Sequence, residues 1–288
     1  MAKEDIRVFN RGFLRGLAVL ALTLVTAASA FAQTPAADPN NGALTFTSGV
    51  DIPTKYLFRG LSQEADSKIT LFPYGDLGIS LFSGDGGVKS ATVNFGIWNS
   101  LMTGSSGLDG PNDKLHYEQD FYTTLTLGFA QGYSLGTTYT AYTSPNNGFG
   151  TVHELAFKVA KTGWLSPYGL VAFELDGQAD GGASEGTYLE LGVGPAWSFA
   201  GGKATFSVPV KFGFSLNDYY EGPEGDEKFG YFQIGGLVSA PLTSPESKFG
   251  VWTVKGGVDV FTLGETPKAF NSGDRGKVVA TFGIGVVY

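Results

Sequence analysis

Hydrophobic and polar residues alternate with a period of two along most of the chain. In the last segment, KVVATFGIGVVY (277–288), one parity carries apolar residues from Val278 to Tyr288 and the other carries mostly small or polar residues. Successive side chains of a strand point to opposite faces, so this segment predicts a strand with one apolar face. The pattern recurs from Ala43 onward and predicts twelve strands separated by turn residues. The predicted strands are 43–60, 69–82, 88–101, 116–130, 132–143, 151–161, 167–176, 187–199, 203–216, 229–242, 248–262 and 277–288.

The connections between these strands alternate in length. Each odd-numbered connection is at least as long as its even-numbered neighbours, as in LSQEADSK (61–68) followed by SGDGG (83–87). In an antiparallel up-and-down order, the longer connections then share one end and the tight turns share the other. Bacterial outer-membrane barrels have this asymmetry. We therefore expect an all-β fold, a single antiparallel up-and-down transmembrane β-barrel of about 12 strands, with 10 or 14 strands as alternatives.

A soluble β-sandwich is the competing interpretation, because its apolar faces would cover a core instead of meeting lipid. Strand length favours the barrel, since most predicted strands have about 10–16 residues against a usual ~5–6. Charged residues make up 16% of the chain, against a typical ~25%. The polar faces are therefore poor in charge for the exposed surface of a soluble sandwich.

The N-terminal segment has the features of an export signal. Three arginines precede an apolar run at 16–27, and small residues follow up to Ala32. The run is shorter than the ~20 residues of a membrane-spanning helix, so we expect a cleaved signal peptide. Cleavage after Ala30 and a retained membrane anchor are the alternatives. The expected divisions are 1–32 (signal peptide, removed), 33–42 (flexible periplasmic lead-in) and 43–288 (outer-membrane barrel).

Charge and composition exclude several partners and sites. The whole chain has a net charge of −8, and removal of residues 1–32 leaves 15 basic against 25 acidic residues, or −10. So acidic a chain is a poor nucleic-acid partner, because phosphates are met by clustered Lys and Arg. The absence of Cys excludes a disulfide scaffold, redox Cys pairs and Cys-based metal sites.

Residues that could carry catalysis are few. His116 and His153 are the two histidines, and each stands next to or near a Glu at the start of a predicted strand. By parity His116 shares the inner face with Glu118, whereas His153 lies on the outer face. Barrel enzymes that act on lipid pair a His with a Ser and a polar third residue, and no pattern here marks a nucleophilic Ser. We expect no enzymatic activity, with a lipid-modifying barrel enzyme as the alternative.

Neither a metal nor another cofactor is expected. The acidic segment DYYEGPEGDEK (218–228) lacks the ligand spacing of an EF-hand calcium site, so it predicts a solvated loop. The Gly-rich segments 84–87 and 181–184 predict turns and not phosphate cradles, because no helix is expected after them.

Charged residues of both signs fall on the inner parity of the predicted strands. Charges inside a closed barrel need water or paired partners, and twelve strands enclose a space between the filled ~8-stranded barrels and the open ~16-stranded porins. We therefore expect a porin-like channel for passive diffusion of small polar solutes or ions through a narrow charged lumen. A structural or adhesion barrel with a closed lumen is the alternative. The predicted pore-lining residues are Asp51, Lys55, Arg59, Asp76, Glu118, Asp120, Glu154, Lys158, Glu174, Glu190, Lys211, Lys255 and Asp259.

One motif resembles that of a known family. YLFRGLSQ (56–63) resembles the first-strand motif Tyr-x-Phe-Arg-Gly-Ile-Ser-Gln of the TorF-like porins of proteobacteria, with Leu61 in place of Ile. FGIWNS (95–100) and YEQDFY (117–122) are similar to later segments of that family, in the same order. The resemblance covers about residues 44–130 and implies an outer-membrane channel of undefined solute.

The resemblance carries over no catalytic residue. By strand parity, Arg59 would reach into the lumen near the outer rim, where Gly60 would let the strand turn towards its loop. Such a protein is expected in the bacterial outer membrane, in contact with lipid and lipopolysaccharide. It would arrive there by export through the periplasm with chaperones and the barrel-assembly machinery.

Overall fold

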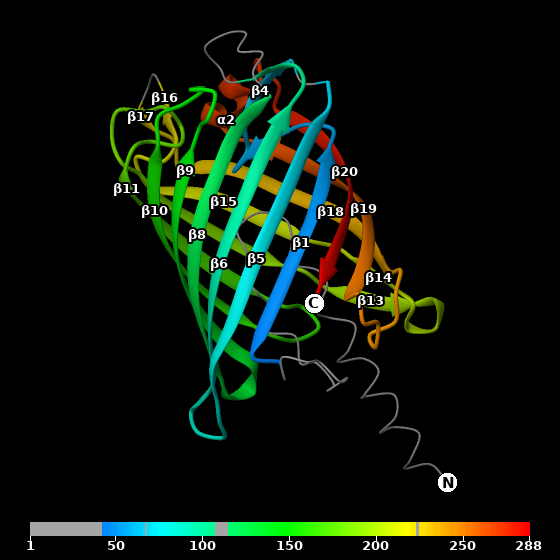
Figure 1. Ribbon diagram of the computed structural model, residues 1–288. Helices are drawn as coiled ribbons and strands as arrows, with labels where there is room; N and C mark the ends of the chain where they lie inside the picture. Colours follow the sequence, from blue (N-terminus) through cyan, green and yellow to red (C-terminus); the bar gives the residue numbers. More distant parts are fainter. Residues whose placement is uncertain (1–41, 67, 107–114, 223–224) are drawn as a thin grey trace.

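Twelve long strands form a closed antiparallel barrel in the computed structural model (Figure 1). The structure describes residues 42–66, 68–106, 115–222 and 225–288, so the predicted signal peptide and nearly all of the lead-in lie outside the described residues. Each barrel strand pairs with the next one along the chain, and β1 pairs with β20 to close the ring. The barrel strands are β1 (Leu44–Pro53), β5 (Thr70–Ser83), β6 (Val88–Met102), β8 (His116–Phe129), β9 (Tyr133–Thr143), β10 (Val152–Lys161), β11 (Tyr168–Asp176), β12 (Thr187–Val193), β15 (Val210–Asn217), β18 (Phe229–Pro241), β19 (Val251–Leu263) and β20 (Gly276–Val287). This confirms the predicted fold class and strand count.

The two ends of the barrel differ as predicted. The longer connections lie together at one end, which we call the loop end and which is uppermost in Figure 1. It carries the short strands β4 (Glu64–Asp66), β7 (Ser105–Ser106), β16 (Glu221–Gly222) and β17 (Gly225–Asp226), and the helix α2 (Glu265–Phe270). The opposite end, the turn end, carries the short turns η1 (Ala130–Gly132) and η2 (Ala200–Gly202). The described part of the chain contains no helix long and apolar enough to cross a membrane.

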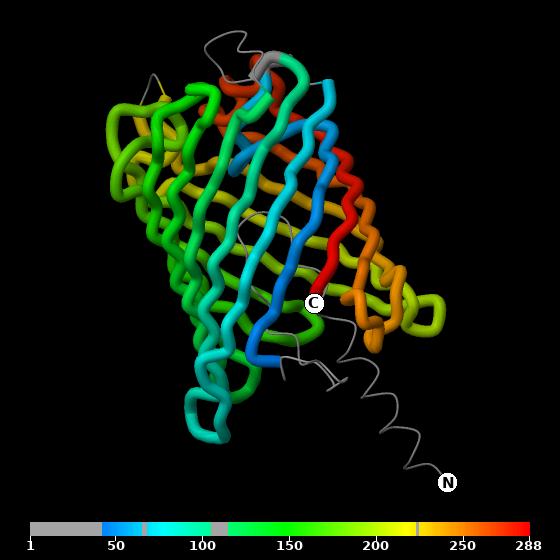
Figure 2. Tube along the Cα trace, in the orientation of Figure 1, coloured from blue at the N-terminus to red at the C-terminus, as the bar shows by residue number. Residues whose placement is uncertain are grey.

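Two of the predicted strands are interrupted by proline. β13 (Ala196–Phe199) follows β12 after Pro195, and β14 (Ala204–Ser207) precedes β15 before Pro209. Proline has no N–H to donate, so the regular ladder breaks at both positions. The carbonyls of Pro195 and Pro209 still accept hydrogen bonds, from the N–H of Val208 and of Gly235. β13 and β14 form a hairpin that leaves the barrel wall at the turn end (Figure 2), and β14 also pairs with β18.

The outer face of the barrel is apolar and the inner face is polar. Outward side chains such as Phe95 and Phe282 are about half exposed, at 49% and 53%. Inward neighbours such as Thr124 and Thr138 are buried and bond each other at 2.8 Å. A soluble protein buries its large apolar residues and exposes its polar ones. This wall has the opposite arrangement. The exposed large apolar residues include Phe46, Leu77, Phe121, Leu125, Phe157, Phe173, Leu191, Phe212, Ile234, Val258 and Val260.

The predicted first strand, 43–60, is wrong in its second half. β1 ends at Pro53, and the chain then turns into the barrel as a tight hairpin of β2 (Leu57–Phe58) and β3 (Leu61–Ser62). The hairpin turn is left-handed, with φ of 48° at Arg59 and 85° at Gly60. Backbone with positive φ at two successive positions reverses the chain within two residues. We call residues 54–64 the plug.

The apolar core lies inside the barrel at the loop end, around the plug. One cluster of buried residues contains Tyr56 and Phe58 of the plug with Phe72, Met102, Tyr117, Tyr142 and Val152 of the wall. A second cluster contains Leu57 and Leu61 of the plug with Tyr188, Tyr219, Tyr220, Tyr231, Phe261, Leu263 and other wall residues. The plug is therefore packed on both faces by the barrel that surrounds it.

Candidate functional site

The plug carries one buried positive charge into the barrel. Arg59 is 7% exposed, and its two terminal nitrogens bond the two carboxylate oxygens of Glu154 on β10 at 2.6 and 2.8 Å. Glu154 is 2% exposed and also accepts a bond from the hydroxyl of Tyr142 at 3.2 Å. A bidentate pair of this kind fixes the orientation of both side chains. Arg59 and Glu154, 95 positions apart in the sequence, join the plug to the wall.

Aromatic rings surround the guanidinium of Arg59. Its central carbon lies 4.1 Å from the centre of the Tyr188 ring, 4.9 Å from that of Phe58 and 5.2 Å from that of Tyr219. Arg59 also donates to the Tyr219 hydroxyl at 2.7 Å. Cation–π contacts strengthen when the site is shielded from water, as here. Charge pairing and ring stacking therefore act on the same guanidinium group.

The backbone of the plug turn is held from the loops. The Tyr220 hydroxyl donates to the carbonyl of Arg59 at 2.9 Å, and the Asn271 amide donates to the carbonyl of Gly60 at 2.8 Å. Asn271 also donates to the carbonyl of Pro267 in α2 at 2.8 Å. These bonds satisfy buried backbone acceptors, which are costly to leave unpaired. Three segments far apart in sequence thus meet at the Arg59–Gly60 turn.

Two carboxylates face the plug from β8. Glu118 and Asp120 are 4% and 7% exposed and lie beside Tyr56. One carboxylate oxygen of Asp120 has no hydrogen-bond partner among the described residues. On β11, Glu174 is buried and accepts bonds from the N–H of Ala179 at 2.7 Å and from that of Gly186. The wall around the plug is therefore rich in buried carboxylates.

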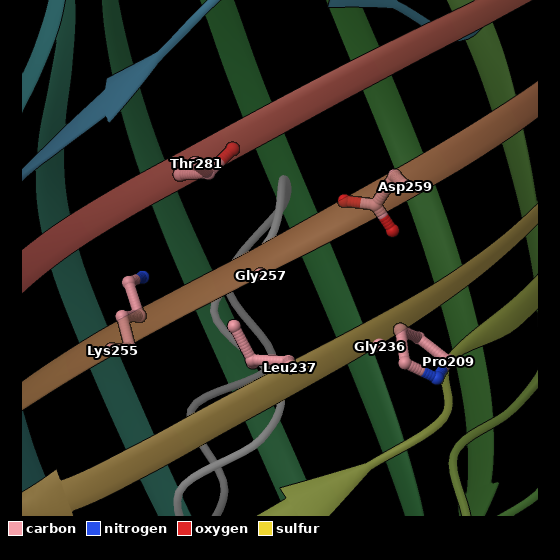
Figure 3. Close-up of a pocket in the computed structure, with 7 residues that line it drawn as sticks. All are labelled: Pro209, Gly236, Leu237, Lys255, Gly257, Asp259 and Thr281. Carbon is pink, nitrogen blue, oxygen red and sulfur yellow. The ribbon is translucent and has the colours of Figure 1, made fainter.

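Further from the loop end, inward charges are paired. Asp51 and Lys255 form an ion pair of 2.9 Å, and Gln233 donates to Asp259 at 2.7 Å. Lys255 and Asp259 border a small pocket of about 20 Å³ in the inner wall of β18, β19 and β20 (Figure 3). That is room for about one water molecule. On β5, Asp76 accepts a bond from Asn94 at 2.6 Å.

Tyrosine hydroxyls bond the inward carboxylate of Glu190. Tyr168, Tyr188 and Tyr231 donate to its two oxygens at 2.5, 2.8 and 2.7 Å. The Lys158 ammonium lies 4.1 Å from the centre of the Tyr168 ring. These bonds offset the free-energy cost of placing a charged carboxylate away from bulk water.

Several inward tyrosines lie against the wall, each over a glycine on the neighbouring strand. The register places Tyr168 opposite Gly192 and Tyr122 opposite Gly96. A Cβ atom at Gly192 would lie 2.4 Å from the Tyr168 ring, so only glycine permits this approach. The same arrangement holds for Tyr74 over Gly49. The hydroxyls then reach carboxylates, as from Tyr122 to Asp76 at 3.0 Å.

The structure places the predicted lumen residues in two groups. Near the plug lie Arg59, Glu118, Asp120, Glu154 and Glu174; along the wall lie Asp51, Asp76, Lys158, Glu190, Lys211, Lys255 and Asp259. Lys55 and Arg59 are not on a barrel strand, because the chain has left β1 at Pro53. Lys55 is half-buried near Glu64, Lys277 and Asp274. At the same rim, Lys277 donates to Asp274 at 2.6 Å.

The predicted inward orientation of His116 is wrong. The pairing of β6 with β8 shifts register between Ser100 and Leu101, which turns both Tyr117 and Glu118 inward. His116 instead contacts the side-chain oxygen of Asn99, with its Nε2 at 3.0 Å. His153 is on the outer face as expected and contacts the Tyr139 hydroxyl at 2.8 Å. Among the described residues, the ring nitrogens of His116 and His153 make these two side-chain contacts.

The acidic loop 218–228 is held by the chain itself. Glu221 accepts bonds from the N–H of Ala183 and of Ser184, at 2.5 and 2.9 Å. Burial raises the pKa of the neighbouring Asp180, which accepts a bond from the N–H of Glu221. Glu224 lies outside the described residues. Within the described residues no three His, Asp or Glu side chains are grouped as metal ligands would be.

Comparison with solved structures finds other barrels at low identity. The NanC porin is 12% identical with a TM-score of 0.42, over 85% of this chain and 99% of that one. Outer membrane phospholipase A from Escherichia coli is 13% identical with a TM-score of 0.44, over 83% and 89%. The translocator domain of the autotransporter NalP from Neisseria meningitidis is 11% identical with a TM-score of 0.41, over 86% and 90%. These likenesses do not identify a function.

No protein-family model and no curated protein sequence matches the chain. The resemblance of YLFRGLSQ to the TorF-like porins therefore stays a prediction. The structure assigns this motif a place of its own, since its Arg and Gly form the turn of the plug.

Sequence reasoning missed the aromatic partners of Arg59. Tyr188 and Tyr219 contact the guanidinium and Tyr142 bonds its partner Glu154; they come from three segments, and none was a candidate site residue. One signal was present: Tyr188 and Glu190 share a parity with other inward residues, so a tyrosine stood on the polar face. Tyr219 follows β15 in a loop, where parity gives no information.

Proposed function

We propose that this protein resides in the bacterial outer membrane and forms a narrow channel for passive diffusion of small polar solutes or ions. In this proposal the plug occupies the loop end of the barrel, and solute passes when the plug shifts. The observation that carries the proposal is the inner wall of the ring closed by β1 and β20, where Asp51 pairs with Lys255 and the carboxylates of Asp76 and Asp259 accept bonds from Asn94 and Gln233.

The outer face supports the membrane location. Large apolar side chains cover it, and a closed barrel leaves no unpaired strand edge in the hydrocarbon region. Aromatic residues gather at the turn end, where Trp164 and Trp197 pack at 6.1 Å between ring centres. Rings of this kind favour the membrane–water interface. We assign the turn end to the periplasm and the loop end to the outside, in contact with lipopolysaccharide.

The inner wall supports a polar solute. Carboxylates, lysines and hydroxyls line it, and the charges of Lys255, Asp76 and Glu190 are held by Asp51, Asn94 and Tyr168, respectively. A wall built only to be filled would place apolar side chains there, because buried ion pairs stabilise little over apolar packing. Groups that are paired and fixed in position also suit selection among ions. No catalytic role is part of the proposal.

The plug favours a second candidate, a structural or adhesion barrel with a permanently closed lumen. Leu61 and Tyr56 are 0% and 1% exposed, so they are as buried as core residues of a soluble protein. The two candidates differ in one property. A gate opens when its anchors are weakened, whereas a permanent core only loses stability.

Planar-bilayer recording of the purified protein separates them. We expect rare channel openings in the wild type and frequent ones in Tyr220→Phe combined with Asn271→Ala, which removes two bonds to the plug backbone. Tyr133→Phe, at an exposed position on the turn end, is the matched control and should behave as the wild type. Heat-modifiable migration in gels confirms that each variant is folded. If the folded double variant shows no conductance at any voltage, the channel proposal is refuted and the structural role remains.

A further inference from the structure

The pocket that holds Arg59 is formed by residues of the barrel wall and loops, together with Phe58 of the plug itself. Glu154 comes from β10, Tyr142 from β9, Tyr188 from β12 and Tyr219 from the loop after β15. We call these four residues the cation cage. Arg59 enters it from the plug, which is a separate segment.

Two members of the cage, Tyr188 and Tyr219, have hydrogen bonds that do not involve the plug. The Tyr188 hydroxyl donates to Glu190 at 2.8 Å and lies 3.0 Å from the Tyr231 hydroxyl. The N–H of Tyr219 donates to the Ser215 side chain at 3.0 Å. A site whose side chains are fixed by their own neighbours is preorganised for a ligand. Tyr188 and Tyr219 would therefore keep their positions when Arg59 leaves.

The chemistry of the cage selects a flat cation. A carboxylate that accepts two parallel bonds matches the edge of a guanidinium group, and a tyrosine ring 4.1 Å away matches its face. A compact ammonium ion could satisfy the charge but not both the bidentate bonds and the stacking. Guanidinium-type organic cations are the ligands with all three properties.

The surroundings also favour positive charge. In and around the plug, the buried charged side chains described are Arg59 and the carboxylates of Glu64, Glu118, Asp120, Glu154 and Glu174. One carboxylate oxygen of Asp120 is without a partner. If Arg59 left, Glu154 would be a buried charge without compensation, which is strongly unfavourable. An incoming cation would restore the balance.

We infer that the cation cage of Tyr142, Glu154, Tyr188 and Tyr219 is a binding site for guanidinium-type organic cations, and that Arg59 is its tethered occupant. Such a cation competes with Arg59 for Glu154, and its binding favours the displaced plug. The binding site stands on the geometry alone. The effect on opening rests on the proposed function.

The test uses the full-length protein in detergent with guanidinium chloride at low millimolar concentrations, far below those that denature. In Arg59→Ala the cage is vacant, and we expect guanidinium to raise the melting temperature in a saturable manner. Urea, the neutral analogue of the same shape, and potassium chloride at equal concentration should produce no saturable rise. In Arg59→Ala with Glu154→Gln the guanidinium effect should disappear.

Conductance reports the second part of the inference. We expect Arg59→Ala to open more often than the wild type, and guanidinium to reduce its current with the same concentration dependence as the thermal shift. A thermal shift without conductance in any variant would keep the binding site and reject the channel. No difference between guanidinium and potassium in Arg59→Ala, or an equal effect in the double variant, would overturn the site.

Folding of the variant is itself a readout. Should Arg59→Ala refold poorly, its folded yield with guanidinium is compared with its yield in potassium chloride, using heat-modifiable migration. Rescue by guanidinium that is lost in the double variant supports the site. Equal yields in the two salts would reject it.

Discussion

Replacing Glu154 by Gln tests how strongly the plug depends on one buried ion pair. The side chains of Arg59 and Glu154 are 6% and 2% exposed, so water does not replace a lost partner. Gln keeps one acceptor oxygen but presents an amide to the second guanidinium nitrogen, and it carries no charge. Removing one partner of a buried pair leaves an uncompensated charge and costs about 3–5 kcal/mol. Domain stabilities are about 5–15 kcal/mol, so the expected loss is a large fraction of the total.

Urea unfolding in detergent micelles, followed by tryptophan fluorescence, measures this loss. Trp98 is a suitable reporter, because its ring lies 5.5 Å from that of Tyr56 in the plug and 4.6 Å from that of Phe72. Glu265→Gln is the matched control, since Glu265 is an exposed carboxylate that also pairs with an arginine, Arg275. We expect no change beyond error for the control. A loss below about 1 kcal/mol for Glu154→Gln would refute the reasoning that the guanidinium stays buried and depends on this partner.

Three further predictions concern the wall and the rim. Gly192→Ala should displace the Tyr168 ring, because the new Cβ would lie 2.4 Å from it, and the variant should lose about 1–3 kcal/mol of unfolding free energy. Phe95→Lys, on the outer face, should lose about 2–4 kcal/mol if the position is near the bilayer midplane, whereas Phe95→Leu should lose far less; equal losses would contradict lipid contact. The hydrogen bond from Lys268 lowers the pKa of Glu265 below its ordinary value. The stabilisation that this bond gives the folded protein is therefore present above the ordinary pKa of a Glu and is lost as the pH falls through the lowered pKa. Lys268→Gln should shift the pKa of Glu265 upward in an NMR titration, and an unchanged pKa would contradict the pair.

The strands and the barrel were predictable because their signal is periodic and local. A segment such as 203–216 shows its two faces residue by residue, and the structure differs from the prediction there mainly at Pro209. The strand count followed from the number of periodic segments, and the difference between the two ends followed from the lengths of the connections. These features depend on neighbours along the chain, so a single sequence contains them.

The failures occur where the period is broken. At Ser100 and Leu101 a register shift reverses the faces, and His116 then lies on the other side of the wall from its predicted place. In a bulge of this kind two residues of one strand lie opposite one residue of the other, and the amino-acid composition of the segment does not reveal it. Parity counted from the strand interior, as at Thr124, remains correct, whereas parity counted across the bulge is inverted.

The plug shows a different limit. The segment YLFRG falls inside the predicted strand 43–60, yet Arg59 and Gly60 take positive φ and turn the chain inward. Arginine is an unusual residue for a left-handed turn, so the local signal for a hairpin was weak. The conformation is stabilised by partners 95 and 160 positions away, Glu154 and Tyr219. Because the energy that holds the turn comes from these distant side chains, substituting Glu154 should release the turn even though every residue of the plug is unchanged.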